Sequence, residues 1–535
     1  MELPLLAGIA LCALGYLIVR LSQTSRRRKG LPPGPPTLPL LGNLHLYSPR
    51  LTYLLYTDWA KKYGDVFSLI LGPVLVVVLS SADAVREIMD RRSALTADRP
   101  ACHFDDIMHD GKYLTMARYS DDWRALRKAA NSVLTPQSAL KHVAIQRAES
   151  IQCMYDLLKT PKRLWWHLRR TSNSSIFCVL YGKRAPTSDS ADLNAAFHAV
   201  EGVIELITPG NFAPVDMFPI LRYVPERWAR WKTRCRETEN AERHVHSRML
   251  QECRERVAKG RNANIEPFMD VVVKRQQELQ LTDEMVMWLG VVLMDGGSHT
   301  TPAFMQSFVM LLTAYPDVQR KLHEEIDAVV GGDRIPHLDD FDHLPYLQAT
   351  IKETHRYRPV FPTCISHAAS QELTYGGYFI PKGSMITVNL WGIYHDPDVF
   401  DDPESFIPDR FLESEFGVRP GVDGSVFKHT MPFGFGRRIC PGRHVAEHAL
   451  RIQTMDLIWG FDFTSEKCVD IDFDAYEPNV MMTPKPFELD VKVRSRTHEK
   501  IIQDEFQEAI PSFEPYEELL SMEEKQWLEA HRHTG

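Results

Sequence analysis

Apolar residues recur at intervals of three and four through most of the chain, and this spacing is typical of amphipathic helices. Residues 317–331 follow it and end at two glycines, and residues 344–359 follow it up to a closing proline. No internal repeat and no strong linker interrupts residues 37–490. Short apolar runs bounded by glycine or proline predict strands at residues 74–79, 373–381 and 384–390. The pattern therefore predicts one large, mainly α domain with small β-sheets, an α+β fold.

The first 30 residues have a different pattern. Residues 3–21 carry no charged side chain before Arg20, and as a helix they would span about 28 Å, close to the thickness of a bilayer core. The basic cluster SRRRKG follows this run, whereas a cleaved signal peptide has its positive charge before the apolar run. We expect residues 1–30 to be a single-pass transmembrane anchor with a basic stop, which leaves the rest of the chain in the cytoplasm.

Two further segments flank the body of the chain. Residues 31–36, LPPGPP, predict a stiff, non-helical hinge because proline fixes φ and lacks an N–H donor. Residues 497–535 contain ten acidic side chains against three lysines and arginines, which predicts an acidic, partly disordered tail. The body is therefore expected to be residues 31–496.

Composition and charge narrow the function. The net charge of −8 argues against nucleic acid as a partner. The nine cysteines are scattered and form no CxxC pair, which indicates a reducing compartment and thiols that pack as small apolar groups.

One cysteine has an unusual setting, in the stretch FGFGRRICPG at residues 433–442. Its glycines allow a tight turn and the close approach of a ligand. Pro441 suits the first turn of a helix that begins just after Cys440, and a thiolate at a helix N-terminus is stabilised by the helix dipole. Zinc and iron–sulfur sites need several ligands, so a single axial thiolate to haem iron fits best.

These residues resemble the haem loop of the cytochrome P450 family. The family pattern Phe-x-x-Gly-x-Arg-x-Cys-x-Gly is matched at all of its fixed positions, which are Phe433, Gly436, Arg438, Cys440 and Gly442. The resemblance implies a haem b cofactor, with Cys440 as the axial ligand of the iron. It extends from the N-terminal anchor to about residue 490 and does not cover the tail.

Other motifs of the family occur in the expected order. Glu353 and Arg356 match its Glu-x-x-Arg pair, which can meet on one face of a helix, and the resemblance adds Arg410 of FIPDRF as their structural partner. Taken alone, Trp123 and His367 are more often a core residue and a satisfied polar group. Within the ordered motifs, the resemblance implies haem propionate contacts by Trp123, Arg127, Arg99 and His367.

The resemblance also implies the reaction and its partners. A haem-thiolate monooxygenase inserts one oxygen atom of dioxygen into a substrate C–H or C=C bond. No flavin or nicotinamide motif is found in the chain, so the microsomal-type anchor implies an NADPH–cytochrome P450 reductase on the same face of the endoplasmic reticulum membrane. Lys128, Arg437 and Arg443 are candidate basic contacts for that reductase, with ordinary solvated charges as the alternative.

The oxygen side departs from the family pattern. The family has Ala/Gly-Gly-x-Asp/Glu-Thr-Thr, and this chain has GGSHTT at residues 296–301, so His299 replaces the acid while Thr300 is kept. A histidine can relay protons near neutral pH. Asp295 lies four residues before His299, and a helix could bring the two together so that the carboxylate orients the imidazole. In the alternative, His299 points away and water delivers the protons.

Two other functions remain open. A haem-thiolate isomerase or dehydratase would take a peroxide substrate and need no reductase, although such relatives abandon the Thr/acid region. A non-catalytic haem or ligand-binding protein is the other alternative. NADPH consumption with a reductase distinguishes the monooxygenase from both.

The substrate is indicated only by class. The resemblance places Phe104, Phe212, Phe361, Met481 and Met482 in the substrate pocket. Such an apolar lining implies a lipophilic or aromatic small molecule, and the chain resembles fungal members of secondary or xenobiotic metabolism.

Overall fold

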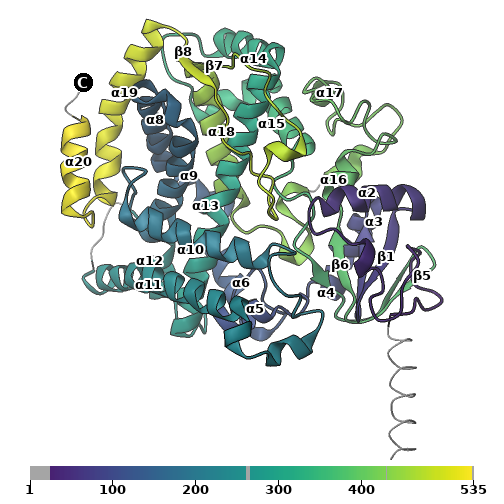
Figure 1. Cartoon of the computed structure of the whole chain (residues 1–535). Helices are drawn as coiled ribbons and strands as arrows, with labels where there is room; N and C mark the ends of the chain where they lie inside the picture. The colour runs from purple at the N-terminus through teal and green to yellow at the C-terminus, as the bar shows by residue number, and fades with distance from the viewer. Residues whose placement is uncertain (1–24, 261–264, 429–430, 533–535) are drawn as a thin grey trace, which may run out of the picture.

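The computed structural model describes residues 25–260, 265–428 and 431–532. Helices form most of the molecule, and a small sheet lies to one side of them (Figure 1). Both helices predicted from periodicity are present, as α14 (Pro316–Val329) and α15 (Pro345–Tyr357).

The remaining helices divide by length. The longer ones are α2 (Thr52–Tyr63), α6 (Asp121–Val133), α8 (Val143–Lys159), α9 (Leu164–Tyr181), α10 (Ala191–Ile207), α11 (Arg230–Ala258), α13 (Asp283–Ala314), α18 (Arg443–Gly460), α19 (Arg496–Phe513) and α20 (Met522–Arg532). The short ones are α3 (Ala82–Val85), α4 (Ser93–Thr96), α5 (His103–Met108), α7 (Pro136–Leu140), α12 (Phe268–Lys274), α16 (Leu390–Tyr394) and α17 (Arg410–Glu413).

The predicted strands also form. They are β2 (Val74–Leu79), β4 (Leu373–Tyr375), β5 (Tyr378–Ile380) and β6 (Met385–Val388). The structure adds four strands that were not predicted, which are β1 (Val66–Leu71), β3 (His367–Ala368), β7 (Phe461–Thr464) and β8 (Asp490–Val493). The main sheet has the order β1-β2-β6-β3, with β2 and β6 parallel. Leu71 pairs with Val74, so only Gly72 and Pro73 form the turn, and Gly72 supplies its φ of 60°.

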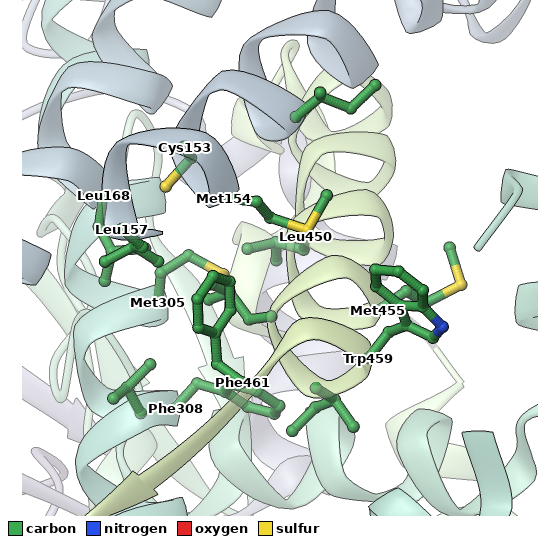
Figure 2. Packing of buried hydrophobic residues seen from close by; sticks show 14 of the residues in the cluster. Cys153, Met154, Leu157, Leu168, Met305, Phe308, Leu450, Met455, Trp459 and Phe461 are labelled. Carbon is green, nitrogen blue, oxygen red and sulfur yellow. The ribbon is translucent and has the colours of Figure 1, made fainter. Parts of the chain in front are cut away.

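The largest core cluster lies between α8, α9, α13 and α18. Figure 2 shows Met154, Met305, Leu450 and Trp459 within it, from three of these helices. Buried residues occur along almost the whole of α13, on every side of the helix. The near-continuous apolar sequence of α13 explains this position, because such a helix is stable only when covered all round.

The C-terminal segment differs from the expectation of a partly disordered tail. Residues 497–535 instead contain most of α19 and all of α20, at the edge of the molecule away from the sheet (Figure 1). Ile502, Phe506 and Phe513 are buried and belong to the main core. The Phe506 ring stacks on Tyr155 of α8 at 4.1 Å between centroids. The acidic composition of this segment concealed an apolar stripe with helical spacing.

The predicted membrane anchor lies mostly outside the described residues, since the description begins at Ser25. Within the part of the chain that is described, no helix has the length and apolar character needed to cross a bilayer. The hinge residues 31–36 form no helix. Arg27 donates hydrogen bonds to the Pro32 carbonyl at 2.8 Å and the Ser68 carbonyl at 2.9 Å, which hold the start of the described chain against β1.

Candidate active site

The cysteine loop is a tight turn that leads into α18. The Cys440 N–H donates to the Phe433 carbonyl at 2.8 Å, and Gly434 and Gly436 have φ of 83° and 51°. A Cβ on Gly436 would lie 2.3 Å from the Met89 carbonyl oxygen, so only glycine fits there. The loop therefore fixes the position of the Cys440 thiol at the start of α18.

Cys440 is half-buried. Burial raises its pKa, and this effect outweighs the hydrogen bond from the Gly442 N–H, which lowers it. The expected stabilisation of the thiolate by the helix terminus is therefore insufficient by itself. A metal cation at the sulfur would supply the missing stabilisation, because a coordinated thiol is deprotonated.

Three arginines converge beside this loop, which are Arg99, Arg127 and Arg438. Arg438 donates to the carbonyls of Ala97 at 2.7 Å and Ala117 at 2.8 Å. Arg99 donates to the Thr115 carbonyl at 2.8 Å. Burial, and then the charge of Arg99, lower the pKa of Arg438 to about 8. The three positive charges therefore have few anions near them, and the one carboxylate that acts on Arg438, Asp98, is already bound by Arg118 at 2.8 Å.

The other predicted propionate contacts belong to the same cluster. The guanidinium of Arg438 lies 4.0 Å from the Trp123 ring centroid, and the positive charges of Arg99 and Arg438 both lower the pKa of His367. The Nε of Arg127 is buried and has no hydrogen-bond partner among the described residues. The indole N–H of Trp123 is occupied by the Leu114 carbonyl at 3.1 Å, and Nδ1 of His367 lies 2.7 Å from the Thr96 carbonyl oxygen. Arg127 therefore retains the clearest unused donor.

One position on α13 adjoins open space. Gly296 is exposed, although the residues around it on α13 are mostly buried, and a Cβ added to it would meet nothing within 4 Å. Thr300, one turn later, is half-buried, and its hydroxyl donates to the Gly296 carbonyl at 2.8 Å. Open space therefore adjoins α13 at Gly296, and Thr300 is bonded to the same position.

Pro302 changes the backbone of α13 at this point. Proline has no N–H, so the carbonyl of Ser298 loses its usual partner within the helix. Asn173 of α9 replaces that partner, since its Nδ2 donates to the Ser298 carbonyl at 3.0 Å. No pattern in the sequence indicates this role of Asn173.

The residues of this site fit a haem group. A half-buried thiol, a cluster of cations short of anions and an open space beside Gly296 suit a flat, dianionic ligand with a thiolate bond to its iron. Cys440 would hold the iron, and Arg99, Arg127 and Arg438 would neutralise the propionates.

The expected contact between His299 and Asp295 is absent. The His299 ring packs on Phe197 at 4.0 Å between centroids, and neither ring nitrogen has a hydrogen-bond partner among the described residues. Burial, and then the charge of Arg169, lower the pKa of His299 to about 3. Asp295 instead accepts a hydrogen bond from the Tyr113 hydroxyl at 2.7 Å. Tertiary packing thus separates two residues that helical spacing would allow to meet.

The structure brings Glu353, Arg356 and Arg410 together. Arg356 binds both carboxylate oxygens of Glu353, at 2.7 and 2.8 Å, and Nε of Arg410 lies 3.2 Å from the same carboxylate. Glu353 and Arg356 are at most 1% exposed, so removing either partner would leave an uncompensated buried charge.

The predicted pocket residues do not all lie together. Phe104 and Phe212 pack edge to face at 6.5 Å between centroids, in a cluster with Trp231. Met482 is buried in a different core cluster with Tyr53 and Trp391, and its place in the pocket lining stays a prediction. Phe361 is half-buried, whereas Met481 is buried.

Sequence reasoning missed a group of ionisable residues next to this site. Asp105, His109 and Glu242 are buried, and His109 is hydrogen-bonded to both carboxyl groups. The spacing of Asp105 and His109, four residues apart, was the only available signal. The contact with Glu242, 133 positions from His109, follows from the fold alone.

Comparisons with known proteins agree with this geometry. The family model described as Cytochrome P450 matches residues 32–491. The chain is 41% identical over 509 residues to a cytochrome P450 monooxygenase of Armillaria gallica, covering 94% of this chain and 96% of that protein. It is 35% identical over 530 residues to another of Arthrobotrys oligospora, covering 96% of this chain and 97% of that protein.

Solved structures give the same result. A zebrafish cytochrome P450 with progesterone superposes with a TM-score of 0.70 at 26% identity, covering 83% of this chain and 99% of that chain. A second zebrafish structure, with abiraterone, has a TM-score of 0.67 at 27% identity and covers 83% of this chain and 100% of that chain. The segment with α19 and α20 lies beyond the family match.

Proposed function

The chain belongs to the cytochrome P450 family and is a monooxygenase of that family, and from this premise we propose its detailed reaction. It inserts one atom of dioxygen into a lipophilic or aromatic small molecule, by hydroxylation or epoxidation. The cofactor is haem b, and the electrons come from NADPH through a membrane-bound cytochrome P450 reductase.

The observation that carries this proposal is the position of one thiol beside a cluster of under-neutralised arginines. Haem held by a thiolate supplies dioxygen activation. Cys440 would bind the iron, and the arginine cluster would fix the propionate edge. Thr300, with its hydroxyl on the Gly296 carbonyl at 2.8 Å, would shape the oxygen side.

The substrate class is supported by the surroundings of the site. Phe361, Phe433 and Ile439 are apolar and half-buried in the central region, which suits a lipophilic molecule. The similar zebrafish proteins hold progesterone and abiraterone. The relatives of Armillaria gallica and Arthrobotrys oligospora are fungal, which supports a role in fungal secondary or xenobiotic metabolism.

The proposed location is the endoplasmic reticulum membrane, with residues 1–30 as anchor and the catalytic domain in the cytoplasm. An exposed apolar surface supports it. Ile220, Tyr223 and Trp228 are 76%, 86% and 71% exposed. Exposed aromatic and aliphatic side chains of this kind suit the membrane interface.

The loop at residues 38–41 adds to the same surface. Leu38, Leu40 and Leu41 are about half exposed, at 45%, 46% and 46%. The Gly72 N–H donates to the Leu41 carbonyl, and a Cβ on Gly72 would lie 2.9 Å from the Phe218 ring. Gly72 thus places the 38–41 loop beside the segment that holds Ile220.

The proposed reductase site is the basic surface near Cys440. Lys128 and Arg437 are exposed there, and Arg437 donates to the Tyr119 hydroxyl at 2.5 Å, which holds it on that face. Arg443, at the start of α18, is half-buried. Positive side chains suit an acidic partner and speed its association at low salt.

A reconstituted assay tests the reaction type. The purified full chain with haem is mixed with NADPH and a cytochrome P450 reductase in lipid, with 7-ethoxycoumarin as a lipophilic probe. We expect NADPH and oxygen consumption that depends on the reductase. Turnover of an organic hydroperoxide without reductase, together with no NADPH consumption when reductase is present, would favour the isomerase or dehydratase alternative.

A further inference from the structure

A cluster of ionisable side chains lies buried between α5, α11, α13 and the segment after α5. We refer to it as the acid network, and no member is more than 7% exposed. Its members are Asp105, His109, Tyr113, Glu242 and Asp295.

Hydrogen bonds join most of the acid network. Nδ1 of His109 lies 2.9 Å from a carboxylate oxygen of Asp105, and Nε2 lies 3.0 Å from a carboxylate oxygen of Glu242. The Tyr113 ring stacks on His109 at 4.6 Å between centroids, and its hydroxyl donates to Asp295 at 2.7 Å. The network therefore leads from α5 to the oxygen side of α13.

The acid network has no hydrogen bond between the carboxyl groups of Glu242 and Asp295. Oε1 of Glu242 and Oδ1 of Asp295 are both buried and have no hydrogen-bond partner among the described residues. An unpaired buried carboxylate oxygen is costly, and the cost falls if the group keeps its proton. Burial, and then the charge of Glu242, raise the pKa of Asp295 well above its ordinary value.

The charges in the acid network favour a state in which at least one of its carboxyl groups keeps its proton. Burial opposes a charge on His109, but its hydrogen bonds to Asp105 and Glu242 outweigh burial and raise its pKa to about 9. One imidazolium thus faces three carboxyl groups, so they cannot all be ionised cheaply. Among the described residues, no group of His, Cys, Asp and Glu side chains is arranged to hold a metal ion.

The acid network reaches the active site at two points. Asp295 directly precedes Gly296, which faces the open space beside α13. Tyr113 directly precedes Leu114, whose carbonyl accepts from Arg438 and from Trp123, both at 3.1 Å. At its other end Asp105 is followed by Asp106, whose side chain is 58% exposed. The network thus lies between the exposed side chain of Asp106 on α5 and the open space that adjoins Gly296 on α13.

We propose that the acid network supplies protons to the oxygen side of this enzyme, with Asp295 as the proton-holding residue nearest the reaction. This inference rests on the proposed monooxygenase function, because oxygen insertion with release of water consumes protons. It gives this task to Asp295 in place of His299, since the His299 imidazole has no hydrogen-bond partner among the described residues.

Asp295 releases its proton toward the space beside Gly296 and becomes a carboxylate that keeps the hydrogen bond from Tyr113. Glu242 then gives a proton to Asp295. His109, which bridges Asp105 and Glu242, in turn gives a proton to Glu242. No electron passes through the network, since electrons arrive from the reductase. The other ionisable groups near the network are Tyr181, Glu239, Arg243 and Asp106.

The chain offers a matched control for Asp295. Asp456 is also buried, and it also accepts one side-chain hydroxyl hydrogen bond, from Ser150 at 2.6 Å. It lies between α18 and α8, away from Gly296. Burial raises the pKa of Asp456 to about 6. Asp295→Asn and Asp456→Asn therefore remove the same chemical group from similar surroundings, only one of which adjoins the site.

The first measurement is infrared spectroscopy of the haem-loaded full chain, which is independent of turnover. We expect a protonated-carboxyl band at pH 8 that is lost in Asp295→Asn and kept in Asp456→Asn. The Asp456 band should appear only when the pH falls below about 6. A spectrum at pH 8 that is identical in wild type and Asp295→Asn would overturn the inference.

The second measurement is the fate of consumed oxygen, with NADPH, reductase and 7-ethoxycoumarin as the probe. In Asp295→Asn we expect proton-dependent turnover to fall on the order of 10²-fold, with more of the NADPH recovered as hydrogen peroxide and a larger solvent deuterium effect. Asp295→Glu, which keeps an acid, should restore part of the turnover.

The outcomes separate the inference from the proposed function. A wild-type enzyme that consumes no NADPH with reductase contradicts the proposed function. If wild type is active and Asp295→Asn matches Asp456→Asn in peroxide yield and isotope effect, the network only holds the fold together and the inference is wrong. A lower melting temperature in both variants, with no difference in peroxide yield, supports that structural role.

Discussion

His299 shows how burial changes a residue that the sequence marks as catalytic. Its imidazole is enclosed against Phe197, and its pKa is lowered to about 3 by burial and by Arg169. The folded chain must therefore hold it neutral, whereas the unfolded chain protonates it below about pH 6.5. Folding excludes that proton, so the free energy of unfolding falls as the pH drops from about 6.5 toward 3.

This predicts the effect of His299→Phe on stability. Phenylalanine removes two unsatisfied nitrogens, so the variant should be more stable than wild type by about 1 kcal/mol at pH 8. The gain should be larger at pH 5, where wild type bears the cost of excluding a proton. Melting temperatures at both pH values, with the exposed His198→Phe as control, measure the difference. An equal gain at pH 5 and pH 8 would show that His299 is not buried as a neutral group.

The structure contains some of the residue contacts that sequence spacing allows and lacks others, and the difference has a physical reason. The contact between Glu353 and Arg356 and the position of Cys440 just before α18 agree with the local sequence pattern. Both depend only on residues that are close together in the chain. His299 and Asp295 also have the spacing to meet, but Tyr113, 182 positions from Asp295, binds the carboxylate instead. A sequence pattern identifies possible neighbours and does not decide between them.

At the level of elements, α13 depends on a neighbouring helix to satisfy its backbone. Pro302 deprives the Ser298 carbonyl of its N–H donor, and Asn173 of α9 supplies a substitute at 3.0 Å. The two residues lie on different helices, so the dependence can be tested by a double-mutant cycle.

Asn173→Ala should lower the free energy of unfolding by about 1–3 kcal/mol, because it leaves a buried carbonyl without a donor. In a Pro302→Ala background, the restored helical N–H can satisfy Ser298, so the same substitution should cost less. Urea denaturation of wild type, both single variants and the double variant gives the coupling energy. Strict additivity would mean that Asn173 does not compensate for Pro302.

The C-terminal helices show that composition alone can mispredict a helical segment. Composition predicted disorder at residues 497–535, yet Ile502, Phe506 and Phe513 form an apolar stripe that packs into the main core. Ion pairs also anchor this region, such as Arg184 with Glu517 at 2.8 Å. The charged residues on the exposed face of a helix dominate its net charge, while a few apolar residues are enough to form its buried face. Periodicity is therefore a better predictor than composition for this segment.

At the scale of the whole molecule, the fold class was predictable and the relation to the membrane stays a prediction. Helical periodicity and short bounded strands indicated the mainly α architecture that the structure shows. The proposed anchor at residues 1–30 falls mostly outside the described residues, and the apolar surface around Ile220 and Trp228 is a second candidate for membrane contact.

Membrane association should therefore depend on two segments. Deleting residues 1–30 should remove alkali-resistant association and leave a weaker, salt-tolerant association through the apolar surface. Adding Ile220→Ser and Trp228→Ser should abolish the remainder, since both side chains are exposed and apolar. Fractionation of cell membranes measures both steps. Unchanged alkali-resistant association after the deletion would place the anchor elsewhere.

The central claim is that Cys440 holds the haem iron through its thiolate, and the carbon monoxide spectrum of the reduced protein tests it most directly. Cys364 is also half-buried and serves as the control. We predict that Cys440→Ser loses the red-shifted Soret band of the reduced carbon monoxide complex, while wild type and Cys364→Ser keep it. A Cys440→Ser protein that binds haem and retains the shifted band would contradict the account.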